Sequence, residues 1–144
     1  MFISDVLRIK GHMVATILPS DSIQVAVRKL AELRIGAVVV QDQWQKLAGI
    51  FSERDLVQLL ARNWSQGLDG PVKEAMNHLV VTCKSTDRID AVLTVMTLNK
   101  VRHVPVVDDG VLVGIVSIGD LVKHRMDEKE LETGVLLEIA RMRV

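Results

Sequence analysis

The sequence predicts a mixed α/β (α+β) fold in which two copies of a β-α-β-β-α unit pack about a pseudo-twofold axis. Two observations predict this fold. The stretch GIFSERDL, which begins at Gly49, recurs as GIVSIGDL from Gly114, and the residues before each copy repeat the same strand and helix spacings. A unit of about 60 residues buries only about 60% of its unfolded surface and is marginal alone. We therefore expect the two copies to share an interface.

The two copies are most similar in sequence around the repeated Ser and Asp. An offset of 66 residues aligns 14–42 with 80–108, and an offset of 65 aligns 47–57 with 112–122. Seven of 11 positions are identical in the second block but only seven of 29 in the first. The Ser-x-x-Asp segment is therefore the first place to look for a function.

Each copy predicts five elements in the same order: an extended segment, a helix opened by Ser, Thr and Asp residues, two strands joined by a polar turn, and a second helix. The first copy places them at 13–18, 23–34, 37–41, 47–52 and from Glu53 onward. The second copy places them at 79–84, 89–100, 103–107, 112–117 and from Ile118 onward.

The chain divides into four parts on this interpretation. They are a first repeat at 3–62, a linker at 63–71, a second repeat at 72–125 and a C-terminal helical extension at 126–144. Short helices at 4–9 and 72–76 are expected to lead into the two repeats. The last helix is expected to run to about Met142. Its long apolar stripe predicts either a partner surface, as in a homodimer, or a helix that folds back over its own core.

Composition excludes several classes of protein. Lys plus Arg and Asp plus Glu both number 18, so the chain lacks the basic footprint of a nucleic-acid binder. No apolar run approaches the roughly 20 residues that span a bilayer, so we expect no membrane span. A single cysteine, Cys83, allows no internal disulfide and fits a cytoplasmic location. We interpret Cys83 as a packing residue.

The segments Ser52-x-x-Asp55 and Ser117-x-x-Asp120 lie where a strand turns into a helix. In outline this is a capping box, in which both side chains satisfy free amides. A capping box prefers Glu or Gln at its fourth position, however, because the side chain must reach back, and here both copies carry the shorter Asp. A kept glycine also precedes each motif. We interpret the pair as a helix start open to an anion or a polyol, with a carboxylate for ribose hydroxyls.

Two halves that each end in G-h-h-S-x-x-D (h, apolar) resemble a tandem pair of CBS domains, also called a Bateman module. The resemblance to small stand-alone bacterial proteins of this family covers roughly residues 3–125. It implies a regulatory module and not an enzyme. It also implies an adenosine ligand, such as AMP, ATP, NAD(H) or S-adenosylmethionine, in clefts between the repeats, and an unidentified regulated protein. The alternative is a structural or dimerisation module with vestigial clefts.

The resemblance further implies which residues form the two clefts, since each cleft takes its Ser and Asp from one repeat and strand residues from the other. Asp would hold the ribose, Ser a phosphate, and aliphatic side chains the adenine. One cleft would consist of Ser117, Asp120, His12, Met13, Thr16, Ile35, Gly36 and Ala37. The other would consist of Ser52, Asp55, His78, Leu79, Thr82, Val101, Arg102 and His103. Because arginine favours phosphate, the second of these clefts is expected to be the better anion site.

Four further residues bear on the clefts. The first repeat has Val39 where the family usually has a proline, which the second keeps as Pro105. Arg54 and Lys123 lie near the two helix starts. Side chains at such positions are more often solvated than in contact with a ligand.

Metal and hydrolase chemistry are disfavoured by spacing. His12 and His78 occupy equivalent repeat positions without a nearby pair of acids, which is weak spacing for a metal. A nucleophile elbow requires G-x-S-x-G, but the residue two before Ser117 is Ile115. We therefore expect no catalytic site.

Overall fold

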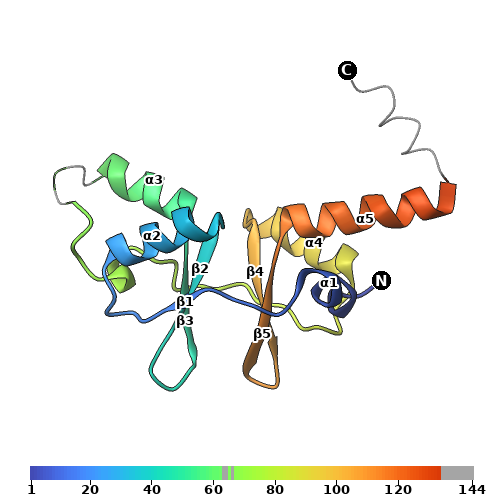
Figure 1. Cartoon of the computed structure of the whole chain (residues 1–144), viewed down its shortest axis with the longest axis horizontal. Coiled ribbons are helices and arrows are strands. Elements are labelled where there is room, and N and C mark those ends of the chain that lie inside the picture. Colours follow the sequence, from blue (N-terminus) through green and yellow to red (C-terminus); the bar gives the residue numbers. More distant parts are fainter. Residues whose placement is uncertain (63–64, 66, 134–144) are drawn as a thin grey trace.

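A computed structural model describes residues 1–62, Ser65 and 67–133 of the chain. Two halves stand side by side, with the helices toward one end of the strands and the hairpin turns at the other (Figure 1). The first half contains β1 (Thr16–Ile17), α2 (Ile23–Leu33), β2 (Ala37–Gln41), β3 (Leu47–Ser52) and α3 (Glu53–Arg62). The second contains α4 (Ile89–Asn99), β4 (His103–Asp108), β5 (Val111–Ser117) and α5 (Ile118–Thr133). The entry segments are α1 (Ile3–Lys10) and the short 3₁₀ helix η2 (Val72–Glu74).

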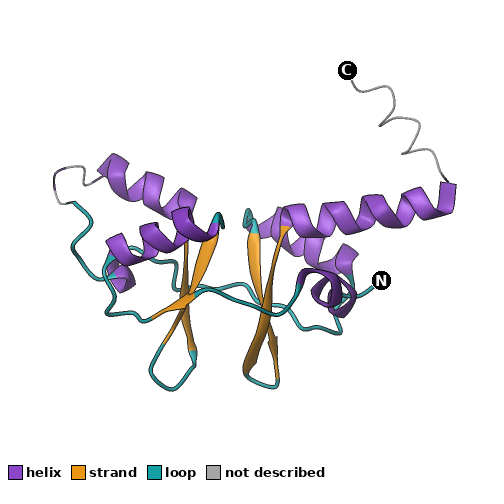
Figure 2. Cartoon of the chain, viewed as in Figure 1, coloured by secondary structure: helices purple, strands orange, loops and turns teal. Residues whose placement is uncertain are grey.

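The predicted repeat is present, and each half is built on an antiparallel hairpin (Figure 2). The predicted bounds of β2 and β3 and the starts of α3 and α5 coincide with the structure. The expected extended segments are much shorter than predicted. Only Thr16–Ile17 forms a strand in the first half, parallel to β2, and Cys83 makes a single bridge to Val106 in the second.

The Val39 and Pro105 difference accounts for part of this asymmetry between the two sheets. The Val39 N–H donates to the Ala15 carbonyl oxygen at 3.0 Å and extends the pairing of β1 with β2. Pro105 occupies the equivalent position in β4 and has no N–H to donate. Its carbonyl oxygen still accepts from the Cys83 N–H at 3.0 Å, and the Val107 N–H donates to the Cys83 carbonyl oxygen at 2.8 Å, so a single bridge remains where the first half has a strand.

The two entry segments each pack on the other half of the molecule. Ile3 and Leu7 of α1 lie fully buried in the core of the second half, and the Ile3 N–H donates to the Asp87 carbonyl oxygen at 2.9 Å. Val72 and Met76 lie in the core of the first half. The exchange means that neither half completes its core from its own continuous sequence, so the two halves depend on each other for stability.

The helix α5 runs outward beyond the second half (Figure 1). Leu121 at its start is fully buried, and Arg125 pairs with Asp90 of α4. The predicted apolar stripe from Leu131 onward lies outside the residues whose side chains are described, as does the expected end at Met142. No helix in the described part of the chain has the length and apolarity that a bilayer crossing requires.

Candidate functional site

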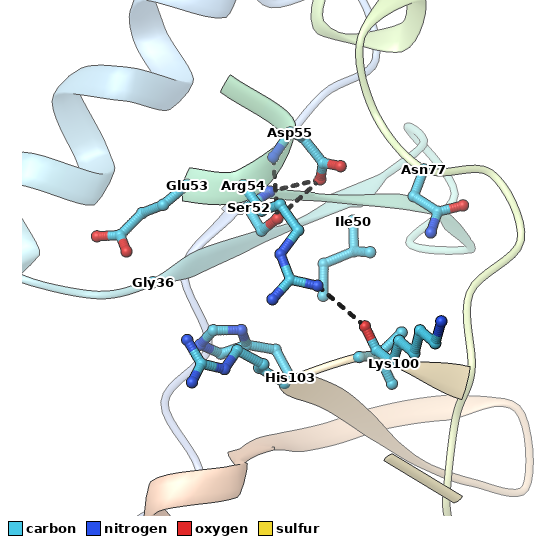
Figure 3. Close-up of a pocket in the computed structure, with 11 residues that line it drawn as sticks. Gly36, Ile50, Ser52, Glu53, Arg54, Asp55, Asn77, Lys100 and His103 are labelled. Atoms are coloured by element: carbon cyan, nitrogen blue, oxygen red, sulfur yellow. Dashed lines mark hydrogen bonds between the residues drawn. The ribbon is translucent and has the colours of Figure 1, made fainter. Parts of the chain in front are cut away.

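A pocket of about 180 Å³ opens at the seam between the two halves. The strand-to-helix junction of the first half forms one wall, and the turn that leads into β4 of the second half forms the other (Figure 3). Its lining consists of Gly36, Ile50, Ser52, Glu53, Arg54, Asp55, Asn77, Lys100, Val101, Arg102 and His103. The pocket therefore brings together residues from both repeats.

Five of the eight residues predicted for this cleft line the pocket: Ser52, Asp55, Val101, Arg102 and His103. His78, Leu79 and Thr82 do not line it and are exposed. Leu79 is 86% exposed and follows Asn77, which does line the pocket, by two residues. The predicted apolar contact thus stands just beyond the rim and not inside the pocket.

Asp55 caps its own helix while it lines the pocket. Its Oδ2 accepts hydrogen bonds from the Ser52 N–H at 2.8 Å and the Ser52 hydroxyl at 3.0 Å, and the Asp55 N–H donates to Ser52 Oγ at 3.3 Å. The expectation that Asp is too short for a capping box is therefore wrong. The other oxygen, Oδ1, accepts no hydrogen bond from any described residue, so it is available to a ligand.

The same reach-back bond occurs elsewhere, so it does not mark a binding site by itself. In each case an aspartate Oδ2 accepts the N–H of the residue three positions earlier. The aspartates are Asp5, Asp21, Asp55, Asp87 and Asp120. What distinguishes Asp55 is the pocket in front of it.

Positive charge gathers on the walls of this pocket. Arg54 extends from the start of α3 and its guanidinium donates to the Lys100 carbonyl oxygen at 3.2 Å, which bridges the two repeats (Figure 3). Lys100 and Arg102 add two more cations, against the carboxylates of Asp55 and Glu53. Arg54 is exposed, as expected for a residue at this position, and the contact across the seam is an addition that the sequence did not predict. Its position two residues after Ser52, inside the motif, was the available signal.

His103 lies against Gly36 at the centre of the seam. A Cβ atom on Gly36 would lie 2.7 Å from the imidazole ring, so only glycine admits the ring in this position. Gly36 was predicted for the other cleft, yet it lines this pocket. Burial lowers the pKa of His103 below its usual value, and the Lys10 charge adds to this effect. The ring is therefore held toward its neutral form.

At Asp120, where the other cleft is expected, Lys10 already pairs with the carboxylate. Lys10 Nζ lies 2.6 Å from Asp120 Oδ2 and 2.8 Å from the Ile115 carbonyl oxygen. The Ser117 N–H also donates to Asp120 Oδ2, at 2.8 Å. Partial burial acts to raise the pKa of Asp120, but the bonds from Lys10 and Ser117 outweigh it and lower that pKa overall. Lys10 was not among the predicted residues.

The remaining residues predicted for the Asp120 cleft differ in how far they are exposed to solvent. His12 Nδ1 lies 3.0 Å from the Val113 carbonyl oxygen, and Met13 is 90% exposed. Thr16 and Ile35 are half-buried, and Ala37 is buried in β2. Met13 is equivalent to Leu79 in the repeat, and both apolar side chains are exposed.

The glycine of each motif packs an entry segment and does not open the helix start. A Cβ atom on Gly49 would lie 2.5 Å from Met76 Sδ and 2.9 Å from the Asn77 carbonyl oxygen. A Cβ atom on Gly114 would lie 2.7 Å from the Leu7 side chain. Both glycines are kept because the exchanged entry segments cross directly over them.

Comparison with known proteins identifies the architecture. A family model described as the CBS domain matches twice, at residues 4–62 and 72–127. The CBS domain-containing protein YhcV of Bacillus subtilis is 33% identical over 118 residues, which cover 81% of each chain. The crystal structure of the CBS-domain protein ATU1752 of Agrobacterium tumefaciens has a TM-score of 0.83 at 44% identity, and the match covers 86% of this chain and 92% of that one.

Two further structural matches were solved with adenosine compounds. The CBS domain protein PAE2072 of Pyrobaculum aerophilum, complexed with AMP, has a TM-score of 0.77 at 28% identity and covers 98% of this chain and 99% of its own. The CBS domain pair of protein MJ0100, in complex with 5′-methylthioadenosine and S-adenosyl-L-methionine, has a TM-score of 0.79 at 27% identity, covering 89% of this chain and 98% of its own. The protein belongs to the CBS-domain family and consists of two CBS domains in tandem.

Proposed function

We propose that this protein is a regulatory sensor that binds an adenosine nucleotide at the seam between its CBS domains, without catalysing a reaction. The observation that carries the proposal is the pocket at Asp55. It combines an unpaired carboxylate oxygen with three cationic side chains, Arg54, Lys100 and Arg102. A ribose diol and a phosphate together satisfy both features, since hydroxyls donate to a carboxylate and phosphate favours arginine.

The residues of the pocket have separate roles in this proposal. Asp55 Oδ1 accepts the ribose hydroxyls while Oδ2 remains in the cap with Ser52. Arg102 and Arg54 contact the phosphates. The adenine lies on the apolar side of the seam, against Val101 and the exposed Leu79. An apolar side chain that is 86% exposed gains when a flat ring covers it.

The pocket volume implies that binding changes the seam. Pockets that bury drug-sized ligands measure roughly 300–1,000 Å³, and this pocket measures about 180 Å³. In this proposal Arg54 leaves the Lys100 carbonyl oxygen and turns toward the phosphates when the nucleotide enters. Since that bond joins the two repeats, the ligand alters their contact. A partner protein that contacts both repeats can detect the change, and the population shift is limited by the difference in ligand affinity.

Thermal denaturation with AMP, ATP, NADH and S-adenosylmethionine tests the proposal. A ligand at 100 times its dissociation constant adds about 2.7 kcal/mol to the free energy of unfolding. For a chain of this size that gain corresponds to a rise in melting temperature of roughly 5–10 °C. If none of the four nucleotides raises the melting temperature, the chain is not an adenosine sensor and the structural alternative takes its place.

The structural alternative has an observation of its own in the exposed apolar side chains of α3 and α5. Val57 and Val122 occupy equivalent positions and are 65% and 43% exposed, and Met126 lies one turn further along α5 at 48%. We propose that this face forms a homodimer in the cytoplasm. Light scattering behind gel filtration tests it: wild type elutes as a dimer and Val57→Glu with Val122→Glu as a monomer. A monomeric wild type rejects it.

A further inference from the structure

The two clefts of this protein are equivalent by sequence repeat but differ in what their aspartates contact. In both aspartates Oδ2 accepts the cap hydrogen bond, and Oδ1 accepts none from a described residue. They differ at Oδ2, because that of Asp120 also forms an ion pair with Lys10 at 2.6 Å, whereas no described cation pairs with Asp55. The side chains of Lys10 and Asp120 are 34% and 27% exposed, so water screens this ion pair less than an open surface pair.

The repeat itself shows what Lys10 replaces. At the offset of 66 residues, the equivalent of Lys10 is Met76, a core residue that is 9% exposed. The residue after Met76, Asn77, makes a two-way backbone bridge with Ile50, with bonds of 2.9 and 3.1 Å. In the other cleft the equivalent carbonyl oxygen, that of Ile115, accepts from Lys10 Nζ at 2.8 Å. The lysine ammonium thus takes the place of a backbone bridge.

The backbone conformation explains how the lysine reaches this position. The next residue, Gly11, has a φ of 99° and a ψ of 169°, a backbone conformation that residues other than glycine rarely adopt. The chain therefore turns away after Lys10. The ammonium of Lys10 then fills the space between the Ile115 carbonyl and the Asp120 carboxylate.

We infer that Lys10 is a specificity-determining residue that closes the Asp120 cleft, so that the protein binds one nucleotide per chain and binds it at Asp55. The inference rests on the proposed function and deepens it. The Lys10 ammonium already pairs with the Asp120 carboxylate at Oδ2, so a ribose hydroxyl there meets an acceptor whose charge is neutralised, and a diol that uses both oxygens has to displace the ammonium. A displaced lysine also loses the Ile115 carbonyl oxygen. At Asp55 the ligand displaces no ion pair, and only Arg54 gives up a bond, to the Lys100 carbonyl oxygen.

Isothermal titration of the full chain with AMP and with ATP measures the number of sites. The test variant is Lys10→Met, which copies the residue of the other repeat. Lys46→Met removes the same charge from the exposed hairpin turn and serves as the control. We expect one site per chain in wild type and in Lys46→Met, two in Lys10→Met, none in Asp55→Asn, and one in Lys10→Met with Asp55→Asn. Lys10→Gln keeps a donor for the Ile115 carbonyl and gives the same result if the methionine variant unfolds.

The possible failures separate the two proposals. Two sites in wild type, or a single site in both Lys10 variants, overturns the role of Lys10 and leaves the nucleotide sensor standing. Loss of binding in the Lys10 variants also overturns it, because Lys10 is then a ligand contact. If neither wild type nor any variant binds either nucleotide, the sensor itself is wrong and the role of Lys10 falls with it.

Discussion

The Ser52 hydroxyl lies 3.0 Å from Asp55 Oδ2 and accepts the Asp55 N–H at 3.3 Å, so the two residues of the motif hold each other at the start of α3. One oxygen of Asp55 is engaged in this cap and the other is not. The capping and ligand-binding interpretations of the motif therefore do not compete, because each uses a different oxygen. The cap fixes the side chain, so a ligand pays less to order it.

Substitution of Asp55 separates these two roles. Asp55→Asn keeps an oxygen that can accept the Ser52 N–H, so we expect nearly full stability but a loss of nucleotide binding. Asp55→Ala loses the cap as well and is expected to lower the free energy of unfolding by about 1 kcal/mol. Urea denaturation measures stability, and titration calorimetry measures binding.

Asp21 provides a matched control for that experiment. It accepts the Leu18 N–H at 2.8 Å in the same reach-back geometry but does not line the pocket at Asp55. Asp21→Ala should lower stability by a similar amount and leave nucleotide affinity unchanged. Full binding by both Asp55 variants is the result that removes Asp55 from the site.

Leu79 and Met13 test where the adenine lies. Both are apolar, equivalent in the repeat and almost fully exposed, at 86% and 90%. Leu79→Ser is expected to weaken nucleotide binding by roughly ten- to a hundredfold, in line with 1.5–3 kcal/mol for burying such a side chain. Met13→Ser, beside the closed cleft, is expected to have no effect. Neither change should alter the melting temperature of the free protein, and equal losses in both variants would contradict the placement.

His103 is expected to make the stability of the free protein depend on pH. Burial lowers its pKa in the folded state below the usual 6.5, so the unfolded chain binds the proton first as the pH falls. Lys10 and Arg102 act in the same direction as burial, while Glu53 and Asp120 oppose it. Stability should therefore decrease from about pH 7 down to the folded pKa of His103 and then level off for this group.

The His103→Gln variant isolates that contribution. The difference between wild type and His103→Gln in urea midpoints, measured from pH 7.5 to pH 5, should grow steadily as the pH falls toward the folded pKa. His78→Gln, which replaces an exposed histidine, should follow wild type throughout. Parallel curves for wild type and His103→Gln would show that the ring is not held neutral by its surroundings.

Gly49 is expected to tolerate no side chain. Its Cβ would meet the Met76 side chain and the Asn77 backbone oxygen within 2.9 Å, and the backbone cannot yield cheaply. We expect Gly49→Ala to cost about 1–3 kcal/mol of stability. Gly119→Ala is the comparison, because its nearest neighbour is the Ser117 hydroxyl at an ordinary 3.6 Å and it lies in a helix. That change should be neutral or stabilising by up to about 1 kcal/mol.

Much of the fold could be predicted because the same pattern of elements occurs twice in the sequence. The apolar runs of β2 and β3, the polar turn between them and the Ser at the start of α3 are local signals, and the predicted bounds agree with the structure. The extended segment before each helix was overestimated in both halves. The two halves differ because Val39 offers an N–H to this segment and Pro105 does not, which can be seen in the sequence only once the partner strand is known.

The site was predicted in part for the same reason. Asp55 lies at a position that both repeats keep, and Arg102 lies directly before β4. Both residues line the pocket. Lys10 was missed, and the contact of Arg54 with Lys100 was not predicted, because the partners Asp120 and Lys100 lie far away in the sequence. The exchange of α1 and η2 between the halves was equally out of reach, since both carry apolar residues that suit either core.

The most direct test of the sensor compares AMP with 2′,3′-dideoxyadenosine 5′-monophosphate in wild type and in Asp55→Asn, by titration calorimetry. A hydrogen bond to a charged group contributes about 1.5–3 kcal/mol, so wild type should bind AMP about ten- to a hundredfold more tightly than the dideoxy compound. Asp55→Asn is expected to bind neither compound at concentrations that saturate wild type, and at higher concentrations to show no preference for AMP. If wild type does not distinguish them, Asp55 does not hold the ribose, and the proposed binding mode is contradicted.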